Sequence, residues 1–94
     1  MSPQDTAAPA QIKTEVKFPV SKKGKFSADY APETTLGTVR TAAMEHFSVA
    51  DDAQFTYVLT HGGQRQENLE ATLGSVAGKA HALEFRLVKV ITQG

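Results

Sequence analysis

The sequence predicts an α+β fold, in which one helix packs on one face of a mixed sheet of four or five strands. Three observations support this prediction. Side chains alternate with a period of two near both ends of the chain, at residues 12–18 and 82–88. Between them, residues 36–47 carry apolar side chains at helical spacing. Because 94 residues with 40% apolar composition suit one core, this helix must cover the sheet.

The first half of the chain predicts a hairpin followed by the helix. Residues 12–18 and 25–31 both alternate, and Gly24 lies in the polar turn between them. Pro32 cannot donate a ladder hydrogen bond and closes the second strand. Thr35 is the expected N-cap of the helix over residues 36–47. The apolar stripe of that helix consists of Leu36, Val39, Ala43 and Phe47.

The second half predicts a third strand, a tight turn and a final strand. Residues 55–60 alternate, and His61, Gly62 and Gly63 follow as a turn. A short edge strand is expected within residues 64–67, and Thr72 caps a short helical turn before the final strand. The first and last strands are far apart in the sequence, so no hairpin connects them. The compact solution therefore pairs these two strands in parallel at the sheet centre, with the helix as the crossover.

Composition excludes several classes of function. Ten basic and ten acidic residues leave no net charge, which disfavours a general nucleic-acid binder. The absence of cysteine excludes disulfides, thiolate metal sites, iron–sulfur clusters and cysteine nucleophiles. The three histidines have no metal-ligand spacing, so neither a metal nor a cofactor is expected. Without a long apolar run or a signal-peptide pattern, we expect a cytoplasmic protein that avoids membranes. We also expect a monomer that is not itself an enzyme.

Domain organisation is simple. Residues 1–11 are rich in Pro, Ala and Gln and predict a disordered N-terminal tail, because they cannot offset the entropy of ordering. Residues 12–88 form the predicted domain. Residues 89–94 follow the last predicted strand with no turn or partner segment after them, and they predict a flexible C-terminal tail.

Over residues 12–89 the chain resembles the ubiquitin-like superfamily, whose fold is the β-grasp. The residues similar to ubiquitin's second strand, closing proline and capped first helical turn are Phe26, Ala28, Tyr30, Pro32, Thr35, Leu36 and Val39. Those similar to its third strand and turn, its later Thr-Leu pair and its last strand are Tyr57, Val58, Leu59, Gly62, Thr72, Leu73, Leu83, Phe85 and Leu87. The superfamily includes covalent modifiers, sulfur carriers and docking domains, so the resemblance implies the fold more strongly than one function.

The resemblance implies a ubiquitin-like protein modifier, similar to the bacterial ones, that is conjugated through Gly94. Its carboxylate would be adenylated and passed to a thiol, although ubiquitin itself ends in two glycines. The implied flexible stem consists of Lys89, Val90, Ile91, Thr92 and Gln93. The implied partner surface consists of Val20, Val58 and Arg86, the last being charged where ubiquitin is aliphatic. The implied partners are activating and conjugating enzymes like those of ubiquitin, a deconjugating peptidase and target proteins.

Two alternatives remain open. A non-covalent interaction module would dock a partner through its sheet face or edge and leave the tail inert. A sulfur carrier would convert the Gly94 carboxylate to a thiocarboxylate, and the missing second glycine counts against it. Asp51 and Asp52 are expected in a solvated loop rather than in acid–base chemistry. The lysines at positions 22, 23 and 25 indicate either a hairpin tip or an acceptor site for chain formation.

Overall fold

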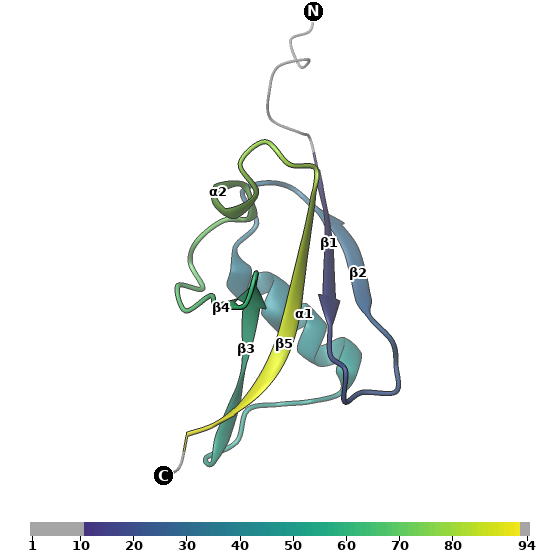
Figure 1. The fold of residues 1–94 in the computed structure, drawn as a ribbon, viewed down its shortest axis with the longest axis vertical. Helices are drawn as coiled ribbons and strands as arrows, with labels where there is room; N and C mark the ends of the chain where they lie inside the picture. The colour runs from purple at the N-terminus through teal and green to yellow at the C-terminus, as the bar shows by residue number, and fades with distance from the viewer. Residues whose placement is uncertain (1–10, 93–94) are drawn as a thin grey trace, which may run out of the picture.

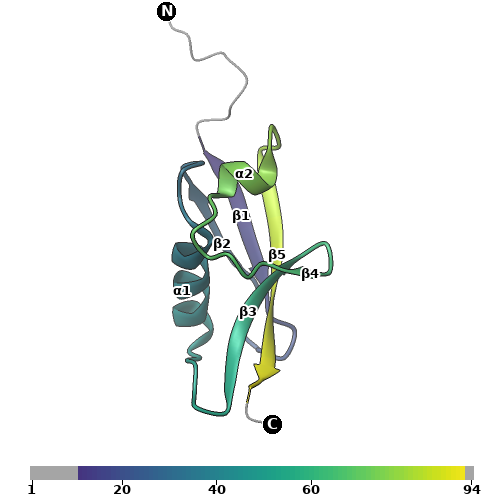
Figure 2. The ribbon, with the colours of Figure 1, turned by 90° about the vertical axis from the view of Figure 1, so that its left-hand side faces the viewer.

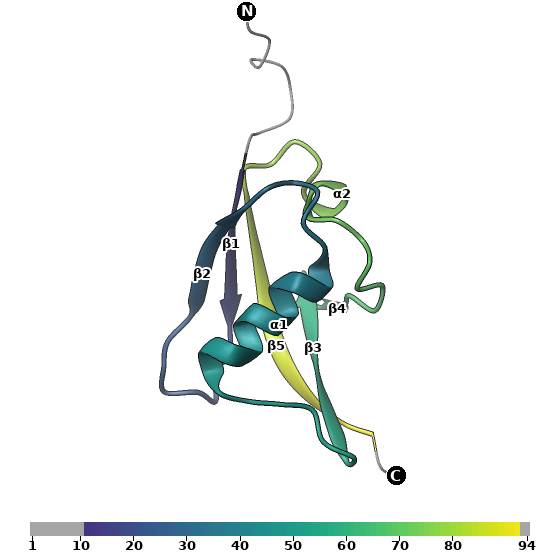
Figure 3. The same cartoon turned by 180° about the vertical axis from the view of Figure 1, so that it is seen from behind.

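The computed structural model describes residues 11–92, which form a sheet with the longer helix packed across one face (Figures 1 and 3). Figure 2 shows the two layers edge-on. The elements are β1 (Ile12–Lys17), β2 (Phe26–Tyr30), α1 (Leu36–Phe47), β3 (Phe55–His61), β4 (Gln64–Arg65), α2 (Leu73–Ala77) and β5 (Ala82–Ile91). No helix in this part of the chain has the length and apolar character needed to cross a membrane.

The sheet has five strands in the order β2-β1-β5-β3-β4. β1 and β5 pair in parallel at its centre, where Val16 lies opposite Phe85. β2 pairs antiparallel with β1, and β3 pairs antiparallel with β5. The predicted central parallel pair with a helical crossover is confirmed, as is the predicted fold class of a mixed sheet with one helix on one face.

The core lies between α1 and the inner face of the sheet. All four residues of the predicted stripe are buried, and Met44 joins them on the same side of the helix. Burying a side chain such as Leu or Phe contributes roughly 1.5–3 kcal/mol, so this stripe is the main attachment of α1 to the sheet. The sheet contributes Ile12, Val16, Leu59, Leu83, Phe85 and Leu87.

Each helix has a threonine as its N-cap, and the two capping residues are paired with each other. Thr35 caps α1 by accepting a hydrogen bond from the Thr38 N–H, and Thr72 caps α2 in the same way through Ser75. The two caps form an antiparallel bridge. The Gly74 N–H donates to the Pro32 carbonyl over 2.8 Å, and a Cβ at Gly74 would lie 3.1 Å from Pro32 Cβ. α2 therefore holds the segment that leads into α1.

The last strand is longer than the sequence predicted. Lys89, Val90 and Ile91 belong to β5 and pair with β3 as far as its first residue, Phe55. The prediction of a flexible segment from residue 89 is therefore wrong for these three residues. The reason is that β3 begins at Phe55 and supplies pairing partners beyond residue 88. Gln93 and Gly94, like residues 1–10 of the predicted N-terminal tail, lie outside the described residues.

Candidate functional site

The sheet face opposite α1 carries the side chains of β3 and β5 that the core does not use. Since Leu87 points into the core, its neighbour Val88 points outward, and Val90 shares that outer face. Val58 lies directly opposite Val88, and Thr56 lies opposite Val90. We call Val58, Val88 and Val90 the outer valine patch; all three are half-buried.

The three residues expected to form the partner surface occupy different places. Val58 belongs to the outer valine patch, and Arg86 is one pair farther along the sheet, opposite Thr60. Val20 lies in the β1–β2 connection and is 79% exposed. Sequence reasoning did not include Val88 in the partner surface and assigned Val90 to a tail. The apolar positions change phase after Leu87, from residues 83, 85 and 87 to residues 88 and 90, so the alternation did not identify either valine.

The outer face divides into a charged half and an apolar half. Lys17 on β1 and Glu84 on β5 form an ion pair of 2.5 Å. The hydrogen bond and charge of Lys17 hold the pKa of Glu84 below its ordinary value. These two residues and Arg86 line a shallow hollow of about 450 Å³, which Gly62 and Gly63 border from the β3–β4 turn. A partner placed on this face would meet paired charges on one side and the outer valine patch on the other.

The carboxyl end of β5 lies along the start of β3. The Lys89 ammonium sits over the Phe55 ring, 4.1 Å from its centroid, an arrangement favourable for a cation–π contact. The Thr92 N–H donates to the Gln54 carbonyl over 2.9 Å, one pair beyond the end of the strand. Ile91 is 67% exposed, although Leu87 on the same face of the strand is buried. An apolar side chain thus remains exposed where β5 ends.

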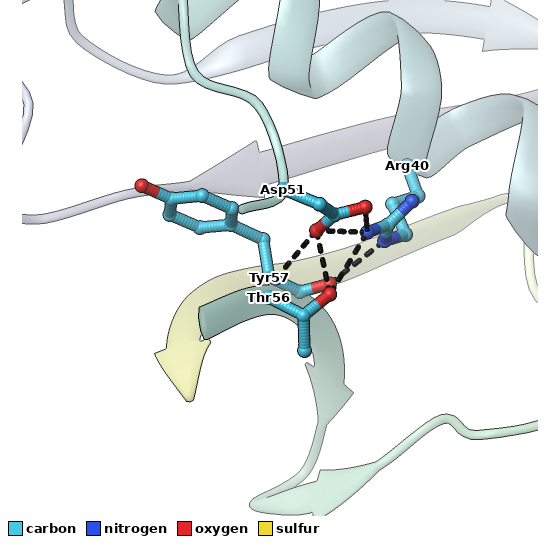
Figure 4. Close-up of polar contacts among 4 residues, drawn as sticks. All are labelled: Arg40, Asp51, Thr56 and Tyr57. Atoms are coloured by element: carbon cyan, nitrogen blue, oxygen red, sulfur yellow. Dashed lines mark hydrogen bonds and ion pairs between the residues drawn. The ribbon is translucent and has the colours of Figure 1, made fainter. Parts of the chain in front are cut away.

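A polar cluster joins α1 to the edge of β3 (Figure 4). Arg40 donates from Nη2 to both Asp51 oxygens, at 2.6 and 2.5 Å. Arg40 Nε donates to the Tyr57 carbonyl over 2.7 Å, and the Tyr57 N–H donates to Asp51 Oδ1 over 3.1 Å. The Thr56 hydroxyl also donates to Asp51 Oδ1, over 2.5 Å.

This cluster was missed at the level of sequence. Asp51 lies in an exposed loop, as expected, but its carboxylate accepts hydrogen bonds from Thr56, Arg40 and Tyr57, which the sequence did not predict. The hydrogen bond from Thr56 and then that from Arg40 lower the pKa of Asp51 below its ordinary 3.8. No signal in the sequence pairs Arg40 with Asp51, because the contact depends on the path of the chain between α1 and β3.

Two of the three histidines pack against aromatic rings. His46 packs between Phe26 and Phe47, with ring centroids 5.5 and 4.8 Å away, and His61 lies 5.6 Å from the Phe85 ring. Within residues 11–92, no three His, Asp or Glu side chains gather closely enough to hold a metal ion. These histidines pack on aromatic rings that themselves belong to the core or border it.

The strand order, the single helix across one face and the central parallel pair define the ubiquitin-like β-grasp fold. Ubiquitin from the archaeon Caldiarchaeum subterraneum matches with a TM-score of 0.69 and 26% identity, covering 89% of this chain and 99% of that one. ATG8 from Trypanosoma brucei matches with a TM-score of 0.66 and 12% identity, over 92% of this chain and 78% of that one. The ubiquitin-like domain of tubulin-binding cofactor B from Drosophila melanogaster gives 0.58 and 17%, over 94% of each chain.

The structural matches differ in how much they say about the class of protein. No protein-family model matches the chain, and no curated protein sequence does. The matches to ATG8 and to the cofactor B domain, at 12% and 17% identity, show the fold alone. The match to the archaeal ubiquitin, at 26% identity, indicates a ubiquitin-like modifier or interaction module.

Proposed function

We propose that this chain is a ubiquitin-like protein modifier, activated and conjugated through the carboxylate of Gly94 by partner enzymes. One observation supports the proposal: the chain matches an archaeal ubiquitin over 99% of that protein's length, with 26% identity and a TM-score of 0.69. A glycine at position 94 suits the chemistry, because a side chain beside the reacting carboxylate would crowd a narrow active site.

The outer valine patch supports the same proposal. Val58, Val88 and Val90 form a continuous strip on a sheet face that α1 does not cover. Large apolar side chains at the centre of such a surface favour protein docking, and the paired charges beside them favour one orientation of the partner. We propose that the activating and conjugating enzymes read this strip together with Arg86, while the exposed Val20 stays outside it.

The test is to express the tagged chain in its source cells and to look for adducts that survive denaturation. Wild type is expected to give adducts larger than the free chain, and some of them are expected to be sensitive to thiols. Deleting Gly94 should abolish all of them, whereas Gln93→Ala, one residue away, should retain them. If wild type and the Gly94 deletion give the same pattern, the modifier proposal is wrong.

A non-covalent interaction module is the second candidate, and the end of β5 favours it. Pairing with β3 continues to Ile91, and Thr92 bonds Gln54. A docking module can keep this end of β5 paired with β3, whereas conjugation through Gly94 would favour a C-terminal stem that is free of β3. Adducts that are absent, together with a partner that copurifies without a covalent bond, would favour this candidate.

A further inference from the structure

β5 is longer than its neighbour β1, so part of one edge of β5 has no strand beside it. The parallel pairing of β1 with β5 ends at Lys17, which lies opposite Arg86. β5 continues to Ile91, and both β3 and β5 run past the end of β1 (Figure 1). Residues 88–91 therefore pair with β3 on one side, while no strand of the described residues 11–92 lies along their other side.

The sequence explains why β1 stops at this point. Pro19 has no N–H to donate to a neighbouring strand. The Ser21 N–H donates to the Phe18 carbonyl over 2.9 Å, so the chain turns directly after β1. The Phe18 ring stays against the core, 5.4 Å from the ring of Phe47. A turn thus takes the place of the residues that would have continued β1 along β5.

Two hydrogen bonds show which backbone groups of β5 face the open edge. Along a strand, the N–H and C=O groups of successive residues point to opposite edges. On the β1 side, the Lys13 N–H donates to the carbonyl of His81, directly before β5, over 2.9 Å. On the β3 side, the Thr92 N–H donates to the Gln54 carbonyl over 2.9 Å. The odd-numbered residues of β5 therefore face the β1 side, and the even-numbered ones face β3.

Lys89 and Ile91 are consequently the residues whose N–H and C=O groups face the open edge beyond β1. Among residues 11–92, no group bonds to them there. Free edge groups of this kind are a template for a further strand. Val88 and Val90 point to the outer sheet face on either side of Lys89, and Ile91 is 67% exposed on the inner face. An added strand would contact the outer valine patch with alternate side chains and Lys89 with the one between them.

The end of the molecule that carries this edge is basic, although the chain has no net charge. The β1–β2 connection and the end of β5 lie at the same end (Figure 1). Residues 16–28 and 85–92 contain no Asp or Glu, and their basic residues are Lys17, Lys22, Lys23, Lys25, Arg86 and Lys89. Within the described part of the chain, only Lys17 and Lys25 of these six form ion pairs. Charge therefore favours an acidic partner at this edge.

We propose that the edge of β5 at Lys89 and Ile91 binds an extended segment of a partner protein, with an acidic residue opposite Lys89 and apolar residues beside Val88 and Val90. Main-chain hydrogen bonds would provide affinity, and the alternating side chains would provide specificity. The pattern of apolar, acidic and apolar residues is the same for either strand direction. The inference goes beyond conjugation, because this pairing requires no free carboxylate at Gly94.

The same charges disfavour a second copy of the chain as the occupant. Two copies paired antiparallel through this edge would bring both Lys89 side chains to one face of the joined sheet, as opposite or diagonal neighbours. Like charges placed opposite each other in a sheet are destabilising, whereas opposite charges stabilise the pair. A carboxylate across from Lys89 replaces that repulsion with attraction.

The first test titrates the isotope-labelled full chain with the capped peptide Thr-Val-Glu-Val-Thr and follows backbone amide shifts by NMR. Shifts are expected at residues 87–91, with a dissociation constant of about 1 mM. The matched control peptide, Val-Thr-Glu-Thr-Val, has the same composition but would place threonines beside Val88 and Val90. It should bind about fivefold more weakly, since it loses the apolar cross-strand pairs.

The second test removes one edge-facing N–H. Ile91→Pro lacks this N–H, whereas Ile91→Ala loses the same side chain and keeps it. Because the Ile91 N–H points away from β3, both variants should keep the bond from Thr92 to Gln54, measured as protection of the Thr92 amide from exchange. Ile91→Pro should lose peptide binding, and Ile91→Ala should retain it within about threefold.

The third test exchanges charges. Lys89→Glu should bind Thr-Val-Glu-Val-Thr about tenfold more weakly, and Thr-Val-Lys-Val-Thr should restore binding to this variant. Wild type should prefer the peptide with glutamate. If Lys89 acted only through its contact with the Phe55 ring, the substitution would weaken both peptides equally.

The proposal is overturned if Thr-Val-Glu-Val-Thr shifts no amide of residues 87–91 in wild type, or if Ile91→Pro and Ile91→Ala bind it equally. It is also overturned if sedimentation equilibrium shows a wild-type dimer that Ile91→Pro dissociates, because a second copy would then occupy the edge. Deleting Gly94 should leave peptide binding unchanged. Loss of adducts with retained peptide binding, or the reverse, therefore distinguishes failure of the modifier proposal from failure of this one.

Discussion

The ionisation of the Asp51 carboxylate affects the stability of the domain. The hydrogen bonds from Thr56 and Arg40 lower its pKa in the folded state below the ordinary 3.8. A lowered folded pKa means that the ionised form favours folding, so this contribution is complete above about pH 4 and is lost as pH falls through the folded pKa. Because the side chain is 44% exposed, solvent screening keeps the contribution modest.

Asp51→Asn should therefore lower the free energy of unfolding at about pH 7 and have little effect at about pH 2. Denaturant titrations of both chains at the two pH values measure this difference. Asp52→Asn is the matched control: its carboxylate accepts a 3.3 Å bond from the Gln54 N–H, and the substitution should leave the free energy of unfolding at about pH 7 near that of wild type. Equal losses for the two variants at neutral pH would contradict the role given to the Arg40–Asp51 pair.

Gly74 is a second residue whose identity has a structural explanation, because its backbone lies close to Pro32. Its N–H bonds the Pro32 carbonyl, and an added Cβ would lie 3.2 Å from that carbonyl oxygen. Proline backbone cannot move aside without losing the bond, so Gly74→Ala should destabilise the domain by about 1–3 kcal/mol despite alanine's better helix propensity. Thermal unfolding measures the change. Thr41→Ala, on the exposed face of α1, should leave the melting temperature nearly unchanged.

At the scale of elements, α1 could be predicted and the end of β5 could not. The bounds of α1 follow from local features, namely the Thr35 cap and an apolar stripe, and both act through neighbours within a few residues. The length of β5 depends instead on its partner, because Lys89 and Ile91 are ordered by pairing with a strand more than thirty positions earlier. The Arg40–Asp51 pair escaped prediction for the same reason: it joins two segments whose proximity only the fold creates.

We predict that the end of β5 can separate from β3 while the rest of the domain stays folded. Phe55→Ala removes the ring beneath the Lys89 ammonium and opposite Ile91. Amide exchange at Val90 and Thr92, which face β3, should accelerate by about tenfold, whereas exchange at Leu83 should change only as global stability changes. If the modifier proposal holds, this variant should also form adducts faster, since more of its C-terminal segment would be free of β3. Unchanged exchange at Val90 would show that the ring does not hold this end.

Across the whole molecule, the two faces of the sheet have separate duties. The inner face holds α1 through buried residues such as Val16 and Phe85, and mutations there are expected to act on stability. The outer face carries the outer valine patch. Within residues 11–92, the longer helix α1 lies on the other side of the sheet (Figure 2). Substitutions on the outer face should therefore separate binding from folding.

Val88→Lys tests this separation. It places a charge at the centre of the outer valine patch, opposite Val58, and loses a cross-strand contact of roughly 0.2–1 kcal/mol. The domain should remain folded with a slightly lower melting temperature, while adduct formation or partner capture should fall by about tenfold or more. Val20→Lys, at a residue that is 79% exposed and away from the patch, should leave both measurements near wild type. If Val20→Lys impairs partner binding and Val88→Lys does not, the docking surface lies around the β1–β2 connection rather than on β3 and β5.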